Sequence, residues 1–175
     1  MKNLALLLIL LFPVISLAQQ PEKGTLKYLD FKRGFKDITL GADISTLASK
    51  IKQLQKNEDG TNIYDYKDPS DNKVGDVGVD GTLVVTYGGK IMRIMVFFDG
   101  GTGDKIDDIF RAAYGRYTDK PNQFMSKYQW DGVDVKLSLD YEDTAKPTAM
   151  FEDNLLLAKF QHNSQDKNKQ AIDQL

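Results

Sequence analysis

The sequence predicts an α+β fold: a two-layer sandwich in which an antiparallel sheet of about five to seven strands carries two helices packed on one face. Two patterns support this fold class. Short runs that alternate apolar and polar residues are joined by turns rich in glycine and aspartate, which is typical of β-hairpins. Two other segments place apolar residues at helical spacing, so each predicts a helix with one apolar face.

The first 18 residues have the features of a secretory signal peptide. Lys2 precedes an apolar run over residues 4–15, and Ser16 and Ala18 are the small residues expected before the cleavage site. A transmembrane anchor is the alternative, but the run is short for a bilayer and Pro13 interrupts it. We therefore expect an exported protein, periplasmic or secreted, with no membrane span after cleavage.

Composition excludes several functions. Of the 23 basic residues only Lys2 lies in the signal peptide, which leaves 22 against 25 acidic residues, and this balance does not attract nucleic acid or anionic membranes. The chain has no cysteine, which excludes disulfides, thiol nucleophiles and the lipid attachment of lipoproteins. The remaining length suits one domain, predicted at residues 31–160, between a polar lead-in at 19–30 and a polar tail at 161–175.

The helices and their flanking segments follow from spacing. A short extended segment at residues 31–41 leads to Asp43, which is suited to cap a first helix ending near Lys56. The apolar face of that helix consists of Ile44, Leu47, Ile51 and Leu54. A second helix is predicted, with Asp104 suited to cap its start and Gly115 suited to stop it. Its apolar face consists of Ile106, Ile109, Phe110 and Ala113.

Two hairpins dominate the predicted sheet. The first covers residues 82–98 and turns at Gly88-Gly89. Both of its faces are apolar, so it should be covered on both sides; one face carries Leu83, Val85, Tyr87, Met92, Ile94, Val96 and Phe98, and the other Val84, Ile91, Met95 and Phe97. The second covers residues 124–141 with a turn at Asp131-Gly132, which pairs Trp130 with Val133 and directs Trp130 into the core. Further strands are expected at 61–66, 149–151 and 155–160.

Four short segments occur in a recognisable order. They are F-K-D-I-T-L-G-A-D-I-S-T-L, V-F-F-D at a strand end, A-A-Y-G at a helix end and Y-Q-W in a strand. This order resembles small exported bacterial α+β proteins of unknown function. The layout is also similar to β-lactamase-inhibitor-like and outer-membrane-assembly lipoprotein folds, in which helices pack on an antiparallel sheet. The resemblance covers residues 31–160, implies this fold and brings no catalytic residue with it.

Catalytic signatures are sparse. The only histidine, His162, has the polar neighbours Gln161 and Asn163, which indicates a surface position rather than the oriented imidazole of a Ser-His-Asp enzyme. Carboxylates can catalyse hydrolysis without histidine. Asp134 and Asp140 share the polar face of the second hairpin, so the alternative function is an exported carboxylate-dependent hydrolase, although solvation is the ordinary role of such residues.

Two groups of residues are candidate binding sites. The acidic loop supplies oxygen ligands of the kind that calcium prefers, although the spacing differs from an EF-hand: Asp68, Asp71, Asp76 and Asp80. No other cofactor is predicted. Tyrosines on or beside loops are expected to be exposed and to contact a ligand or partner: Tyr64, Tyr66 and Tyr117. The sequence therefore favours an exported, non-enzymatic binding or protein-interaction module for a protein or small ligand of the cell envelope.

Overall fold

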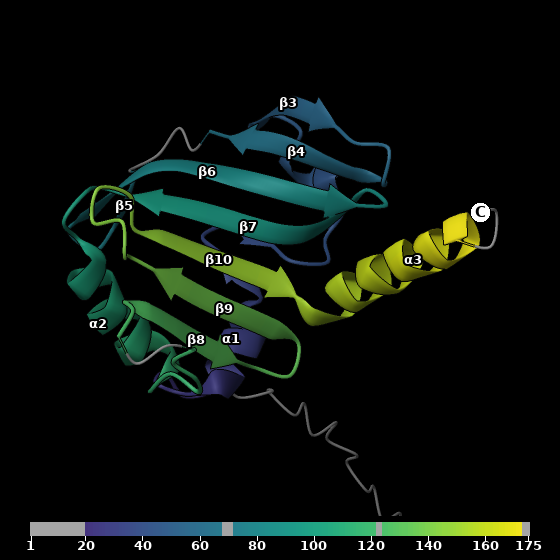
Figure 1. Cartoon of the computed structure of the whole chain (residues 1–175). Helices are drawn as coiled ribbons and strands as arrows, with labels where there is room; N and C mark the ends of the chain where they lie inside the picture. Colours follow the sequence, from purple (N-terminus) through teal and green to yellow (C-terminus); the bar gives the residue numbers. More distant parts are fainter. Residues whose placement is uncertain (1–19, 68–71, 122–123, 173–175) are drawn as a thin grey trace, which may run out of the picture.

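A computed structural model describes residues 20–67, 72–121 and 124–172. Its centre is an antiparallel sheet of eight strands in the order β3-β4-β6-β7-β10-β9-β8, with β5 paired to β6 (Figure 1). β1 and β2 form a separate two-stranded sheet. The predicted α+β class with an antiparallel sheet is confirmed. The predicted numbers of strands and helices are too low, since three α-helices are present in the described residues.

The elements follow one another along the chain with short connections. The helices are α1 (Leu26–Lys32), the 3-10 turn η1 (Ile44–Leu47), α2 (Gly103–Tyr114) and α3 (Asn154–Ile172). The strands are β1 (Gly34–Phe35), β2 (Ile38–Thr39), β3 (Ile51–Lys56), β4 (Thr61–Tyr66), β5 (Lys73–Val74), β6 (Val77–Tyr87), β7 (Lys90–Phe98), β8 (Lys127–Asp131), β9 (Val135–Asp140) and β10 (Thr148–Asp153).

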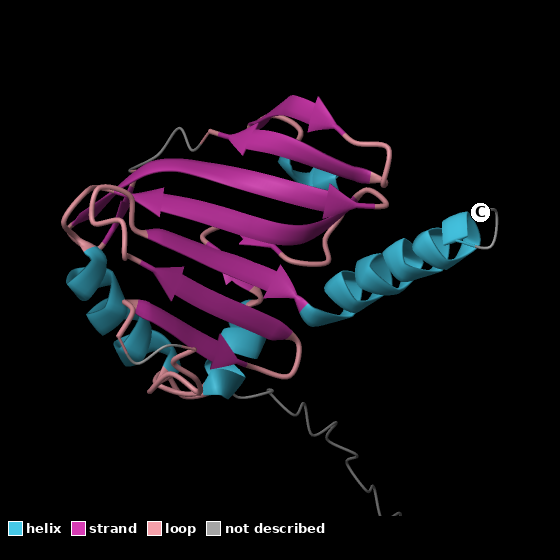
Figure 2. Cartoon of the chain, viewed as in Figure 1, coloured by secondary structure: helices cyan, strands magenta, loops and turns pink. Residues whose placement is uncertain are grey.

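One face of the sheet, here called the covered face, packs against α1 and α2 (Figures 1 and 2). The helices contribute Leu29, Ile106 and Phe110 to the core. The strands contribute alternate residues that are almost fully buried: Val84, Ile94, Val96, Phe98, Trp130, Val135, Leu137, Leu139, Ala149 and Phe151. This contiguous layer of apolar side chains is the hydrophobic core, and its burial supplies the main driving force for folding.

The range predicted as a polar lead-in, residues 19–30, contains the start of α1. Thr25 caps the helix by accepting a hydrogen bond from the amide of Tyr28 at 3.2 Å. Leu29 is fully buried and is the only buried residue of this helix. A two-turn helix with one fully buried residue is too short for apolar spacing to reveal it.

The predicted helix over residues 44–56 is also wrong beyond its first turn. Asp43 does cap that turn, since its carboxylate accepts the amide hydrogen of Ser45 at 3.0 Å. The chain then turns and forms β3, the edge strand that pairs with β4. Leu54 is 55% exposed there, so its helical spacing from Ile51 does not reflect a buried face. Pairing with β4 outweighs a weak local preference.

Residues 155–160, predicted as a strand, belong instead to α3. Asp153, at the end of β10, accepts the amide hydrogen of Leu156 at 2.9 Å and so favours a helix start directly after the strand. The predicted polar tail at 161–175 continues this helix as far as Ile172.

The hairpin of β6 and β7 forms with the predicted turn, but its faces differ from those expected. Val85 pairs with Arg93 whereas Thr86 pairs with Ile91, so Met92 is an extra residue in β7. Such a β-bulge reverses the alternation of side chains along the strand. As a result the prediction that Leu83 shares a face with Met92, Ile94 and Phe98 is wrong: it lies opposite Met95, on the face away from the helices.

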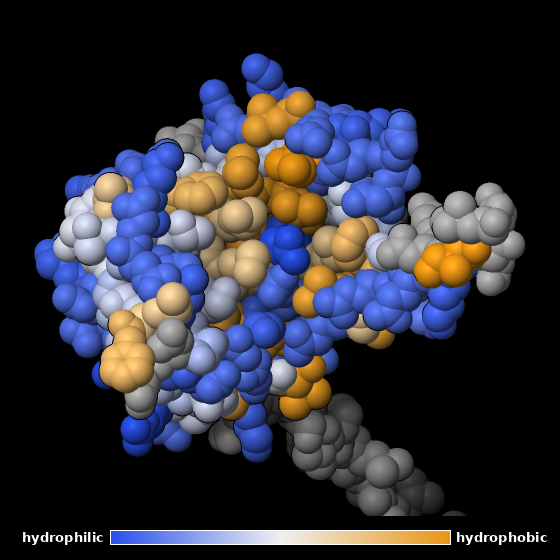
Figure 3. Space-filling view, in the orientation of Figure 1, coloured by the Kyte–Doolittle hydropathy of each residue, from blue (hydrophilic) through white to orange (hydrophobic). Residues whose placement is uncertain are grey.

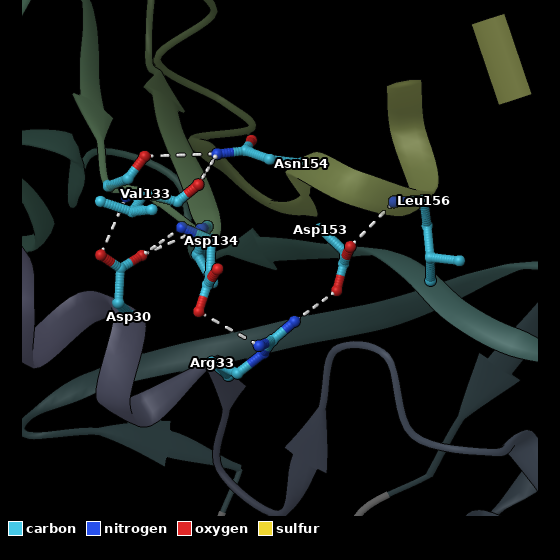
Figure 4. Close-up of polar contacts among 9 residues, drawn as sticks. Asp30, Arg33, Val133, Asp134, Asp153, Asn154 and Leu156 are labelled. Carbon is cyan, nitrogen blue, oxygen red and sulfur yellow. Dashed lines mark hydrogen bonds and ion pairs between the residues drawn. The ribbon is translucent and has the colours of Figure 1, made fainter. Parts of the chain in front are cut away.

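The hairpin of β8 and β9 forms with a different register. Trp130 pairs with Leu137 rather than with Val133. The longer turn is held by Asp30 of α1, whose carboxylate accepts hydrogen bonds from three successive turn amides at 2.8, 2.9 and 3.0 Å (Figure 4). The register differs from the predicted one by four positions, an even number, so Trp130 still lies on the covered face. Val133 becomes 86% exposed.

Candidate functional site

The second face of the sheet, here called the open face, is crossed by no helix in the described part of the chain (Figure 2). Cross-strand pairs define its rows of side chains. The central row is Leu83, Met95, Met150 and Ser138. The row on one side of it consists of Ile63, Val85, Arg93, Glu152 and Lys136. The row on the other side consists of Phe97, Thr148 and Asp140.

The middle of the open face is apolar. Leu83, Met95, Phe97 and Met150 are half-buried, and Val85 is 8% exposed. Figure 3 shows an apolar patch over these strands, with hydrophilic residues around it and a hydrophilic group within it. An antiparallel sheet usually presents polar side chains on its solvent face. A contiguous exposed apolar patch with a polar border marks a contact surface.

A cavity of about 540 Å³ lies at one end of the open face. Its floor is formed by Met95, Phe97 and Met150. The loop after β9 forms its rim and contributes Glu142, Asp143 and Lys146, together with Asp140 at the strand end. The volume is within the range of known ligand sites, and a flexible methionine pair lets the floor adapt to different occupants.

The rim of this cavity has an excess of negative charge. Lys127 contacts Asp140 at 3.1 Å and Glu142 at 3.0 Å. The hydrogen bond to Glu142, and then that to Asp140, raises the pKa of Lys127, which therefore stays charged at neutral pH. With Asp143 and Lys146 included, three carboxylates meet two ammonium groups. The rim therefore favours an occupant that carries a positive charge.

An ion pair interrupts the apolar patch in the adjoining row. Arg93 on β7 lies directly opposite Glu152 on β10, and Nε donates to Oε1 at 2.8 Å. The side chain of Glu152 is only 7% exposed. The two charges satisfy each other, so this pair belongs to the scaffold of the open face.

The helix α3 borders the open face at the end opposite the cavity. The ring of Phe160 contacts that of Tyr87 edge-on, with 5.4 Å between the ring centroids. Asn163 also donates a hydrogen bond to the Tyr87 hydroxyl at 2.5 Å. Beyond these contacts the helix extends away from the sheet (Figure 1). It therefore leaves the central rows of the open face accessible.

The tyrosines predicted as a contact site do not come together. Tyr64 and Tyr66 lie on β4, whereas the ring of Tyr117 is 4.9 Å from that of Tyr128 on β8, at the opposite side of the sheet. Tyr64 and Tyr117 are half-buried. Tyr66 is only 5% exposed and donates a hydrogen bond to Asp37, so the expectation that it is exposed is wrong. Tyr66 is part of the hydrophobic core.

The predicted calcium ligands fall into two groups. Asp68 and Asp71 lie outside the described residues. Asp76 pairs with Lys105 at 3.1 Å, and this hydrogen bond lowers the pKa of Asp76, while Asp80 is exposed on β6. Within the described ranges, no three His, Asp or Glu side chains gather as a metal would require. Calcium binding by the acidic loop stays a prediction.

The two carboxylates of the alternative hydrolase do not converge. Asp134 precedes β9 and Asp140 ends it, which separates them by about 20 Å along an extended strand. Asp134 is paired with Arg33 at 3.2 Å (Figure 4), and Asp140 with Lys127. A glycosidase-like pair needs its two carboxyl groups within about 10 Å of each other. His162 is exposed, as predicted, and contacts Asp166 at 3.3 Å.

Comparisons of the chain with protein-family models, with curated proteins and with solved structures gave no match. The resemblance to exported lipoprotein folds therefore stays a prediction. The signal peptide also stays one, because residues 1–18 lie outside the described ranges. None of the helices in those ranges combines the length and apolar character needed to cross a membrane.

Proposed function

We propose that this chain is an exported, non-enzymatic interaction module that docks a segment of a partner protein on its open face. The observation that carries the proposal is the cavity floored by Met95, Phe97 and Met150 within a larger apolar patch. The helices already cover the opposite face, so this patch is apolar surface that the described fold leaves half-exposed. Its burial against a partner would be favourable.

The surroundings of the cavity indicate the chemistry of that segment. Apolar side chains would lie on the methionine and phenylalanine floor. A lysine or arginine next to them would reach the carboxylates of Asp140, Glu142 and Asp143. We therefore infer an amphipathic basic segment as the partner.

Methyl NMR of methionine tests this proposal directly. Protein labelled with ¹³C at methionine methyls is titrated with a peptide of alternating leucine and lysine, and in parallel with one of alternating leucine and glutamate. We expect the basic peptide to shift the Met95 and Met150 resonances in a saturable way. Met92, which is 2% exposed, and Met125, which lies outside the cavity lining, serve as internal references.

A charge-introducing variant provides the second part of the test. Met150→Lys places a cation in the cavity and should abolish the shift of Met95, whereas Met125→Lys should leave it unchanged. Equal shifts with the acidic peptide, or shifts that persist in Met150→Lys, would contradict docking at this site.

A further inference from the structure

A second cavity lies on the covered side of the sheet, far from the open face. It is a groove of about 290 Å³ between α1 and α2, closed at one side by β1 and β5. Grooves between helices are common positions for small apolar ligands. Nothing in the proposed docking of a partner on the open face uses this groove.

The walls of the groove are apolar and aromatic. Phe35, Phe110 and Tyr114 come from the core and are 7%, 3% and 8% exposed. Ile109 and Ala113 of α2 line the groove and are half-buried. The groove thus opens a route from the surface to the side chains of the core.

The rim of the groove has one sign of charge. Lys32, Lys36 and Lys73 line it, and no aspartate or glutamate does. Lys32 and Lys73 form no ion pair with any residue of the described ranges. The stems of such lysines pack along apolar walls while their ammonium groups stay at the water boundary. Lys73 does act at longer range on Asp76, whose pKa its charge helps to lower, but that carboxylate is paired with Lys105. A negative group at the mouth of the groove would therefore meet two ammonium groups that have no ion-pair partner in the described ranges.

Tyr114, one of the residues that line the groove, carries a hydroxyl group. Burial, with a smaller contribution from Tyr28, raises the pKa of Tyr114 to about 12, so the hydroxyl keeps its proton at neutral pH. Within the described part of the chain it has no hydrogen-bond partner. It can donate to an oxygen of a bound molecule.

From this combination we propose that the groove between α1 and α2 binds a fatty acid. The alkyl chain lies against Phe35, Ile109 and Phe110, and the carboxylate pairs with Lys32 and Lys73. Charge complementarity selects the head group, and the apolar walls accept the alkyl chain. This site is separate from the peptide-docking face and would operate whether or not that face binds a partner.

Calorimetric titration with three amphiphiles of equal chain length tests the proposal: decanoate, decanol and decylamine. We expect saturable binding of decanoate, binding of decanol weaker by about tenfold, and no measurable binding of decylamine. The double variant Lys32→Glu/Lys73→Glu should weaken decanoate binding by about tenfold or more, because both cations are replaced by anions. Both lysines are exposed, so the fold should tolerate the change.

The control carries the same change in charge at another surface. Lys52→Glu/Lys56→Glu on the edge strand β3 should bind decanoate as the native protein does. A second variant, Ala113→Phe, fills the groove and should remove binding of both decanoate and decanol while near-ultraviolet circular dichroism verifies the fold. Equal affinity for decanoate and decanol, or equal weakening by the β3 control, would overturn the proposal. The proposal would also fail if decanoate shifted the Met95 and Met150 methyl resonances and its binding were unchanged in Ala113→Phe, because decanoate would then bind the open face.

Discussion

The two faces of the sheet are built from the same strands and yet differ in how far their side chains are buried. On the covered face, side chains such as Leu137 and Phe151 are fully buried and interlock with α1 and α2. On the open face, Met95, Phe97 and Met150 remain half-buried, and a salt bridge interrupts the apolar surface. The apolar residues of the covered face account for folding. Those of the open face stay half-buried in the described fold, which is why we propose the docking role for them.

The largest effect should come from the covered face. Trp130 is fully buried, its ring meets that of Phe110 edge-on, and its indole nitrogen donates to the carbonyl of Gly115 at 2.8 Å. We expect Trp130→Ala to lower the free energy of unfolding by about 3–5 kcal/mol, measured by chemical denaturation. Phe124→Ala, at a position 89% exposed, is the aromatic control and should change it by less than about 0.5 kcal/mol. An unchanged midpoint for Trp130→Ala would mean that the tryptophan is not part of the core.

A smaller effect is expected from the salt bridge of the open face. Arg93→Met leaves the carboxylate of Glu152 buried without its ion-pair partner. In the native protein the side chain of Arg93 is 30% exposed. We expect a loss of about 2 kcal/mol, less than for a fully buried pair. The double variant Arg93→Met/Glu152→Met should regain most of this stability, because no unpaired charge remains. A double variant as unstable as the single one would indicate that the pair holds the strands in register.

Sequence patterns predict the covered face better than the open face, for identifiable reasons. The alternation in β9 and the helical spacing in α2 each arise within one element, so both were predicted correctly. The register of β8 and β9 instead depends on Asp30, about a hundred residues earlier in the chain. No local pattern contains such a contact.

The open face was missed for a related reason. The extra residue Met92 reverses the alternation within β7, and a bulge of this kind leaves no clear trace in a sequence whose two faces are both apolar. The site also combines Met95 and Phe97 with Met150, which come from strands that only the fold brings side by side. The order β7-β10-β9 is a consequence of tertiary structure, and the residues themselves gave no signal beyond being apolar.

Asp37, in the turn between β1 and β2, makes part of the protein's stability depend on pH. Burial raises the pKa of Asp37, but hydrogen bonds from Lys50 and Tyr66 outweigh it and hold the pKa below its usual value of 3.8. A carboxyl group with a lowered pKa contributes stability above its unfolded pKa and loses that contribution as the pH falls through its folded value. Asp37→Asn should therefore cost about 1 kcal/mol at neutral pH, a modest amount for a group that is 46% exposed. Melting temperatures of the variant and the native protein should converge as the pH falls below about 3.8. A gap of constant size down to that range would show that the carboxylate charge has no role.

The smallest effect on stability should come from the floor of the cavity. Met150 and Phe151 are neighbours in β10, but Met150 lies on the open face and Phe151, fully buried, on the covered face. We expect Met150→Thr to change the free energy of unfolding by about 0.5 kcal/mol, because threonine suits a strand and the position is only half-buried. Phe151→Thr should instead cost several times as much, since it leaves a cavity in the core.

The same pair of variants separates folding from docking. Met150→Thr removes the thioether from the cavity floor, so the Met95 methyl should respond at least about fivefold more weakly to the leucine–lysine peptide while the protein melts almost as the native chain does. This combination distinguishes a residue retained for contact from one retained for packing. If Met150→Thr destabilised the protein as strongly as Phe151→Thr, the open face would be a second core that another part of the molecule covers, and the docking proposal would fail.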